Sequence, residues 1–137
     1  MPSSLPDSEG QATPHGRVLL VDDEAMVVRV IARLLTRAGF DVTVHTDSRE
    51  ALRAIESDPL AFDVMVTDMT MPGMSGIELA RGASAAGASM PVVLLSGWID
   101  AEAERQARAA GIARVLSKPI QVATLVEVVT DVLPTLH

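Results

Sequence analysis

The sequence RVLLVDD at residues 17–23 places two acids directly after a short, almost uninterrupted apolar run. Three further runs of four or five residues are nearly all apolar: residues 63–67 (DVMVT), 91–95 (PVVLL) and 114–117 (RVLS). Such runs are typical of parallel strands that are covered on both faces. The segment 41–46 (DVTVHT) differs, because Val42 and Val44 alternate with polar residues, and it predicts a half-exposed edge strand.

Helical patterns fill the intervals between these runs. Five segments show them: residues 25–38, 48–57, 76–86, 101–110 and 121–133. The first is expected to bury one face that carries Val27, Ile31, Leu34 and Leu35. The last has an apolar stripe made of Val122, Leu125, Val126, Val129, Val132 and Leu133. Segment 101–110 carries alanines but no large apolar residue, so we expect it to pack loosely and to be the mobile helix.

Capping side chains precede three of the helical segments. Ser75 and Glu78 have the spacing of a capping box. Asp47 and Asp100 stand immediately before two other segments, where an acid can accept hydrogen bonds from the first amides of a helix.

Strands and helices therefore alternate along the chain, joined by short connections. This order predicts an α/β fold with helices on both faces of one parallel sheet. Right-handed crossovers and an early edge strand favour a doubly wound, five-stranded sheet of order 2-1-3-4-5, the flavodoxin-like (βα)5 arrangement. Ligands of such sheets bind at the carboxyl ends of the strands.

Chemically useful side chains stand at those predicted strand ends. They are Asp22 and Asp23, Asp68, Ser96 and Lys118. Three carboxylates that converge on one rim repel one another, so positive charge must offset them. Lys118 supplies one charge, and Mg²⁺ suits the remainder because it takes carboxylate and phosphate oxygens while keeping waters.

The same residues suggest phosphoryl chemistry. The chain has no cysteine, and none of its histidines stands at these strand ends, so a carboxylate is the expected nucleophile. Attack of Asp68 on phosphorus would give an aspartyl phosphate. Lys118, the hydroxyl of Ser96 and the metal would stabilise charge on the transferring oxygens.

Four motifs in order make the chain resemble the receiver domain of two-component signalling. They are LLVDDE (19–24), VTDMTMPGMSG (66–76), LLSG (94–97) and SKPI (117–120), and each ends a predicted strand. The resemblance covers nearly everything from Arg17 to Leu133. Each motif alone is weak, whereas the four in this order form a specific signal.

The resemblance implies roles for the acids. Asp68 would be the phosphoacceptor, and Asp22 and Asp23 would bind Mg²⁺. Asp68 and the backbone carbonyl of Thr70 would be further metal ligands. The phosphodonor would be a histidine kinase or a histidine phosphotransfer domain, because His15, His45 and His137 lie away from the predicted site.

The resemblance also implies how phosphorylation would be sensed. Ser96 and Lys118 would contact the phosphoryl group, and the Lys118–Pro119 bond would be cis. The family commonly has an aromatic residue three places before the lysine, where this chain has Val115, which puts the aromatic-coupled switch in doubt. Trp98 is expected over the mouth of the site, either slowing attack by water or only covering the start of the next helix.

The composition of the chain limits the classes of function that it could have. The 137 residues carry a net charge of −7, with the basic residues scattered, which argues against direct binding of nucleic acid. No apolar run could span a bilayer, and the absence of cysteine fits a cytoplasmic protein.

We expect residues 1–16 to be a flexible arm or linker, 17–133 the receiver domain and 134–137 a C-terminal tail, without an output domain. The chain would then be a stand-alone regulator or a receiver cut from a hybrid kinase, of unknown oligomeric state.

Two other functions compete with this interpretation. A pseudo-receiver would bind partners without phosphorylation, although all five site residues are present. A phosphatase of the haloacid-dehalogenase type also uses an Asp nucleophile and Mg²⁺, but it needs Asp-x-Asp at the first strand. Here Glu24 stands two places after Asp22, and we expect no cap domain.

Overall fold

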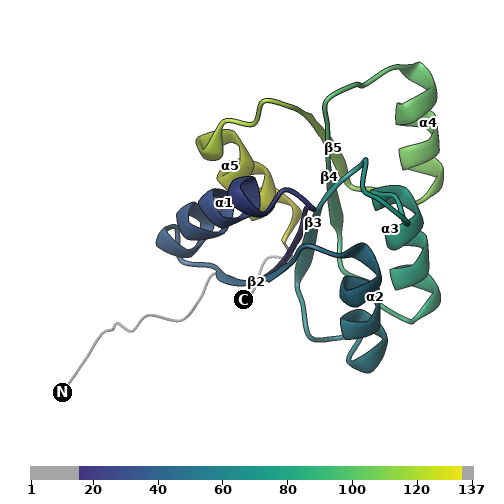
Figure 1. Ribbon diagram of the computed structural model, residues 1–137, viewed down its shortest axis with the longest axis horizontal. Helices are drawn as coiled ribbons and strands as arrows, with labels where there is room; N and C mark the ends of the chain where they lie inside the picture. Colours follow the sequence, from purple (N-terminus) through teal and green to yellow (C-terminus); the bar gives the residue numbers. More distant parts are fainter. Residues whose placement is uncertain (1–15, 134–137) are drawn as a thin grey trace.

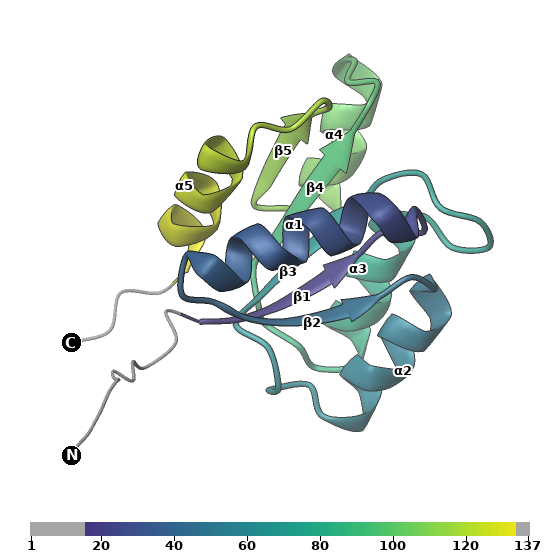
Figure 2. The same cartoon turned by 60° about the vertical axis from the view of Figure 1, so that its left-hand side comes forward.

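A computed structural model describes residues 16–133 of the chain. Its five strands are all parallel and lie in the order β2-β1-β3-β4-β5, as predicted (Figures 1 and 2). The strands are β1 (Arg17–Val21), β2 (Asp41–His45), β3 (Val64–Asp68), β4 (Val92–Ser96) and β5 (Arg114–Ser117). The helices are α1 (Ala25–Arg37), α2 (Ser48–Ser57), α3 (Gly76–Ala85), α4 (Ala101–Ala109) and α5 (Val122–Val132). All ten predicted elements are present, with ends that differ by one residue at most.

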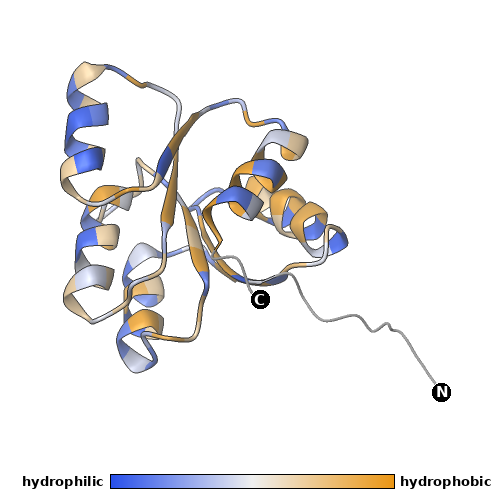
Figure 3. Ribbon diagram, turned by 180° about the vertical axis from the view of Figure 1, so that it is seen from behind, coloured by the Kyte–Doolittle hydropathy of each residue, from blue (hydrophilic) through white to orange (hydrophobic). Residues whose placement is uncertain are grey.

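The sheet separates two layers of helices. Helices α1 and α5 cover one face, and α2 and α3, with α4, lie on the other (Figures 1 and 2). Side chains along β1 alternate between the two faces: Val18 and Leu20 pack with α1 and α5, whereas Leu19 and Val21 pack with α2 and α3. Figure 3 shows the apolar strands running through the middle of the molecule. The central strands are thus buried on both sides, which explains their unbroken apolar runs.

The buried face of α1 differs from the prediction at two positions, Val27 and Leu34. Val28, Ile31 and Leu35 are buried, whereas Val27 is 41% exposed and Leu34 is only partly buried. Since α1 begins at Ala25, positions 28, 31 and 35 repeat at helical spacing toward the sheet, and position 27 lies about 100° further round the helix. Two adjacent valines fit the apolar pattern equally well, so periodicity alone selected the wrong one.

The predicted caps are formed. Ser75 and Glu78 make a capping box at α3, and Asp47 accepts hydrogen bonds from the first amides of α2. At α4 the side chain of Asp100 accepts a hydrogen bond from the amide of Ala103. These caps fix where each helix leaves the rim at the carboxyl end of the sheet.

Helix α4 is held by little apolar contact. Ala107 is its one buried residue, and it packs with Ile77 of α3 and Leu94 of β4. This agrees with the expected loose packing of α4, while its mobility stays a prediction.

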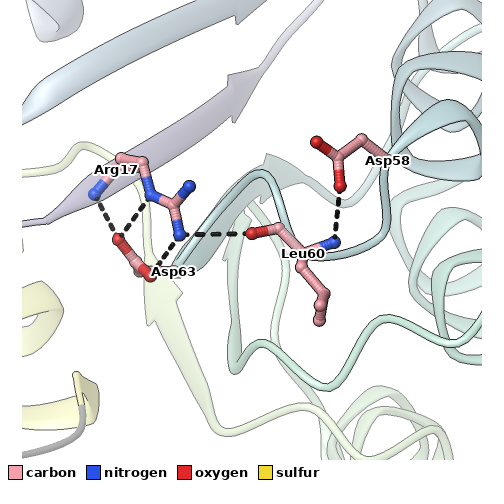
Figure 4. A network of polar contacts seen from close by, with 4 residues as sticks. All are labelled: Arg17, Asp58, Leu60 and Asp63. Atoms are coloured by element: carbon pink, nitrogen blue, oxygen red, sulfur yellow. Dashed lines mark hydrogen bonds and ion pairs between the residues drawn. The ribbon is translucent and has the colours of Figure 1, made fainter.

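The opposite end of the sheet is joined by polar contacts (Figure 4). The guanidinium of Arg17 donates hydrogen bonds to both carboxylate oxygens of Asp63, each at 3.1 Å, and to the carbonyl of Leu60. The backbone N–H of Arg17 also donates to Asp63, at 2.8 Å. The start of β1 is therefore tied to the segment just before β3.

None of the described helices is both long and apolar enough to cross a membrane. The predicted C-terminal tail and residues 1–15 of the predicted arm lie outside the described residues.

Candidate phosphoacceptor site

The carboxyl ends of β1, β3 and β4 and the residue after β5 meet at one cleft of about 620 Å³. Most of the predicted site residues line it, namely Asp23, Asp68, Thr70, Ser96 and Lys118. Asp22 is fully buried and does not line the cleft, but it lies next to Asp23 and Asp68. The structure therefore brings all six predicted positions to the same edge of the sheet.

The three carboxylates form a group that suits a divalent cation. Asp22, Asp23 and Asp68 can each offer one oxygen, and these oxygens lie within 4.8 Å of one another. Asp22 Oδ1 accepts a hydrogen bond from the N–H of Glu24 at 3.0 Å. Asp22 Oδ2 is buried and has no hydrogen-bond donor. A buried carboxylate oxygen without a donor is costly, and a hard cation coordinated there would satisfy it.

Burial raises the pKa of Asp22 above its usual value, and the charges of Asp68 and Glu24 add to the effect. The Glu24 N–H and the charge of Lys118 only partly oppose it. Asp22 therefore carries the unfavourable charge that a bound cation would relieve.

Lys118 supplies the positive charge of the cleft. Its Nζ lies 3.0 Å from Asp68 Oδ1 and 3.8 Å from Asp22 Oδ2. Partial burial lowers the pKa of Lys118, but the hydrogen bond and charge of Asp68, together with Asp22, outweigh it and leave the pKa raised. The backbone N–H of Lys118 donates to the carbonyl of Ser96, and the following bond to Pro119 is cis, as the resemblance implied.

The hydroxyl of Ser96 is engaged elsewhere. Ser96 Oγ donates to the backbone carbonyl of Trp98 at 2.7 Å and accepts from the Trp98 N–H at 3.2 Å. Trp98 lines the cleft, as expected, while its side chain is 76% exposed. Its indole N–H donates to Asp100 Oδ2.

Sequence reasoning did not assign four polar residues that line the cleft. They are Glu24, Asp100, Glu102 and Gln106. Glu24 follows the two acids of β1, and the others belong to the cap and exposed face of α4, which starts at the same rim. The position of α4 after β4 could have revealed them.

Val115 sits where the family commonly has an aromatic residue. It is partly buried and packs with the small cluster of Ile77, Leu94 and Ala107 beneath α4. A compact aliphatic side chain there has no large ring to move between two positions.

A family profile described as response regulator receiver domain matches residues 18–130. The chain belongs to the response regulator receiver domain family. This receiver domain is 36% identical over 129 residues to the transcriptional regulatory protein FixJ of Azorhizobium caulinodans, covering 94% of this chain and 55% of that protein. It is 31% identical over 117 residues to the response regulator receiver protein CpdR of Brucella abortus, covering 85% and 96% of the two chains.

The fold is also similar to that of solved structures. The chemotaxis protein CheY4 of Vibrio cholerae superposes with a TM-score of 0.79 at 29% identity, covering 89% of this chain and 100% of that one. The receiver domain spans about half the length of the FixJ protein, but nearly all of CpdR. The shared unit is therefore the receiver fold itself.

Proposed function

We propose that this receiver domain accepts a phosphoryl group on Asp68 from a phosphohistidine of a partner protein, in a Mg²⁺-dependent reaction. It then loses the group by hydrolysis or by onward transfer, and in this role it acts in the cytoplasm. It is a signalling phosphoacceptor that catalyses only its own phosphorylation and dephosphorylation. One observation carries the proposal: in one open cleft Asp68 faces Lys118 at 3.0 Å, next to the buried Asp22, whose Oδ2 has no hydrogen-bond donor.

The chain's own residues suit the transfer step. A carboxylate oxygen of Asp68 would attack phosphorus and form a new P–O bond, while the P–N bond of the phosphohistidine breaks and its electron pair stays on the imidazole nitrogen. Lys118 lies where its ammonium group can hold a phosphoryl oxygen. Asp68 is 6% exposed, so the reacting atoms would be shielded from most bulk water.

The residues that would hold Mg²⁺ are Asp22, Asp23 and Asp68, with the backbone carbonyl of Thr70. When bound, the ion supplies positive charge that neutralises phosphate oxygens. Asp22 would contribute its unsatisfied Oδ2. Asp23 is exposed at the mouth of the cleft, where it can reach an ion that keeps several waters.

A protein donor suits the surface beside the cleft. A groove of about 710 Å³ shares Glu24 and Lys118 with the cleft and is otherwise apolar. Its walls include Met26, Val27 and Val30 of α1, all of them exposed. Because a protein that brings its histidine to Asp68 must pass over this rim, the groove supports a histidine kinase or a histidine phosphotransfer domain as the partner.

Intact-mass spectrometry tests the proposal. The chain is incubated with acetyl phosphate, with and without Mg²⁺, beside an Asp68→Asn variant and an Asp47→Asn control that makes the same change outside the cleft. We expect one base-labile phosphoryl adduct on the wild type and on the control, only with Mg²⁺, and none on Asp68→Asn.

Other outcomes would select another function. Absence of the adduct from the wild type would favour a pseudo-receiver that binds partners without phosphorylation. Continued release of phosphate over many turnovers would favour a haloacid-dehalogenase-like phosphatase. An adduct on Asp68→Asn would mean that another residue is the acceptor.

A further inference from the structure

The Ser96 hydroxyl can donate its proton either to the Trp98 carbonyl or to a phosphoryl group on Asp68, but not to both. A serine hydroxyl has one proton, and in this structure it is donated to the Trp98 carbonyl at 2.7 Å. Ser96 is 4% exposed, so the donor side of this partly buried bond is shielded from water. A phosphoryl oxygen on Asp68 could receive the proton only if the bond to Trp98 opened.

The loop that holds this proton is itself tied to α4. Asp100 uses one carboxylate oxygen for each neighbour: Oδ2 accepts from the indole N–H of Trp98 at 3.1 Å, and Oδ1 accepts from the Ala103 N–H at 2.8 Å. Four groups are thus linked in sequence, from Ser96 at the end of β4 through Trp98 and Asp100 to the first turn of α4.

Helix α4 is the helix that such a link could move most easily, because it buries little apolar surface. Its single buried residue is Ala107, so the cap made by Asp100 is a large part of what holds its first turn. Glu102, Ala103 and Gln106 of α4 also form one wall of the cleft. Movement of the cap would therefore change both the helix and the site.

We propose that Trp98 and Asp100 are positioning residues that hold the Ser96 hydroxyl away from Asp68 and couple its release to the first turn of α4. This inference rests on the proposed function, since the competing acceptor is the phosphoryl group on Asp68. Hydrogen bonds to charged acceptors are stronger than those to a neutral carbonyl, so phosphorylation would draw Ser96 away from Trp98. The link passes through the loop and α4, and it needs no aromatic ring at Val115.

Two conservative variants cut the link while keeping its surroundings. Asp100→Asn retains an oxygen that can cap α4, but its second group is a donor and cannot accept from the indole N–H. Trp98→Phe keeps an aromatic ring and removes that N–H. Asp47→Asn makes the same change at the cap of α2, where the side chain accepts only from Arg49 and Glu50.

The experiment measures the rate of phosphorylation by acetyl phosphate with Mg²⁺, and amide exchange in α4 before and after phosphorylation. Both variants lose the indole hydrogen bond that holds the Trp98 loop, so the Ser96 bond to the Trp98 carbonyl should open more readily. We expect the rate to rise by about threefold in both variants and to be unchanged in Asp47→Asn. In the wild type we expect exchange in the first turn of α4 to quicken on phosphorylation. In Asp100→Asn and Trp98→Phe it should be fast already and change little.

The outcomes separate this inference from the proposed function. Wild-type rates and a wild-type exchange response in both variants would overturn the link, while the adduct on Asp68 would still support phosphorylation. No adduct on the wild type would overturn the proposed function and the inference with it. Ser96→Ala serves as a third variant: it lacks the hydroxyl, so its adduct should form without the exchange response in α4.

Discussion

The buried carboxylate of Asp22 is unfavourable for folding but suits the proposed binding of a cation. It is fully buried, one of its oxygens lacks a donor, and burial raises its pKa. Lys118 offers only partial compensation, at 3.8 Å. Such a charge costs folding free energy, and it would be retained because a cation can use it.

Asp22→Asn should therefore stabilise the metal-free domain and remove most of its response to Mg²⁺. The amide oxygen can still accept from the Glu24 N–H, while the buried negative charge disappears. We expect a gain of about 1 kcal/mol in the free energy of unfolding without metal. Thermal unfolding with and without MgCl₂ measures both effects. A variant that is less stable than the wild type in EDTA would contradict the prediction.

Asp63 provides a pH-dependent contribution at the other end of the sheet. Its hydrogen bond with the Arg17 guanidinium lowers the pKa of Asp63 despite partial burial, and the Arg17 N–H and charge contribute as well. A lowered pKa in the folded state means that the contribution is fully present above the unfolded pKa of about 3.9. It is lost as the pH falls through the lower folded pKa.

Asp63→Asn should lose up to about 1 kcal/mol of stability near pH 7, since the pair is partly exposed. The difference from the wild type should stay constant from about pH 7 to pH 5 and shrink below about pH 4. Urea unfolding across this range measures it, with Glu127→Gln on the exposed face of α5 as the matched loss of a carboxylate. A difference that grew in acid would exclude the proposed pairing.

Among the elements, α3 is positioned by its first residue. A Cβ added to Gly76 would lie 2.3 Å from the Asp68 carbonyl oxygen and 2.8 Å from a methyl of Leu94. The amide of Gly76 also donates to the Met69 carbonyl at 2.9 Å. Glycine thus allows α3 to start directly against the strand end that carries Asp68.

Gly76→Ala should cost about 1–3 kcal/mol of stability and slow phosphorylation, because the end of β3 must shift. Gly82→Ala in the same helix is the control. Its Cβ would meet only the flexible methyls of Leu52, at 3.0 and 3.1 Å, and alanine favours a helix. We expect Gly82→Ala to stay at or above wild-type stability in urea unfolding. Equal stability of the two variants would show that the contact at Asp68 relaxes freely.

Packing also ranks the helices by mobility. Helix α4 buries only Ala107, whereas α5 buries Leu125, Val128 and Val129. Local opening costs less where little apolar surface is buried. Amide exchange in α4 should therefore be faster than in α5 by at least about tenfold. Exchange of α4 at the rate of α5 would show that its polar contacts suffice to hold it.

The same strands and helices show which features the sequence could predict and which it could not. Unbroken apolar runs ending in Asp22 and Asp68 predicted a parallel sheet, and the strand ends had to meet at one edge. Periodicity could not choose between Val27 and Val28, because both are apolar. It also could not show that the Ser96 hydroxyl bonds to the Trp98 carbonyl, since the direction of a loop carbonyl leaves no pattern in side-chain types.

At the scale of the whole molecule, one end of the sheet carries a stabilising ion pair and the other end carries the candidate site. Arg17 and Asp63 fasten the amino ends of β1 and β3, while Asp22 and Asp68 follow or end the same strands. A five-residue strand separates the two groups, a distance of about 15 Å. Groups so far apart and without shared partners contribute independently to stability.

The double variant Asp22→Asn with Asp63→Asn tests this independence. Its change in unfolding free energy without metal should equal the sum of the two single changes to within about 0.5 kcal/mol, because neither residue contacts the partners of the other. The pH dependence from Asp63 should persist in the Asp22→Asn background, and the loss of the Mg²⁺ response should persist in the Asp63→Asn background. Urea unfolding of the four proteins measures the cycle. A coupling well above that limit would show that strain at the cleft is transmitted along β1, and the acidic site would then be tuned by the far end of the sheet.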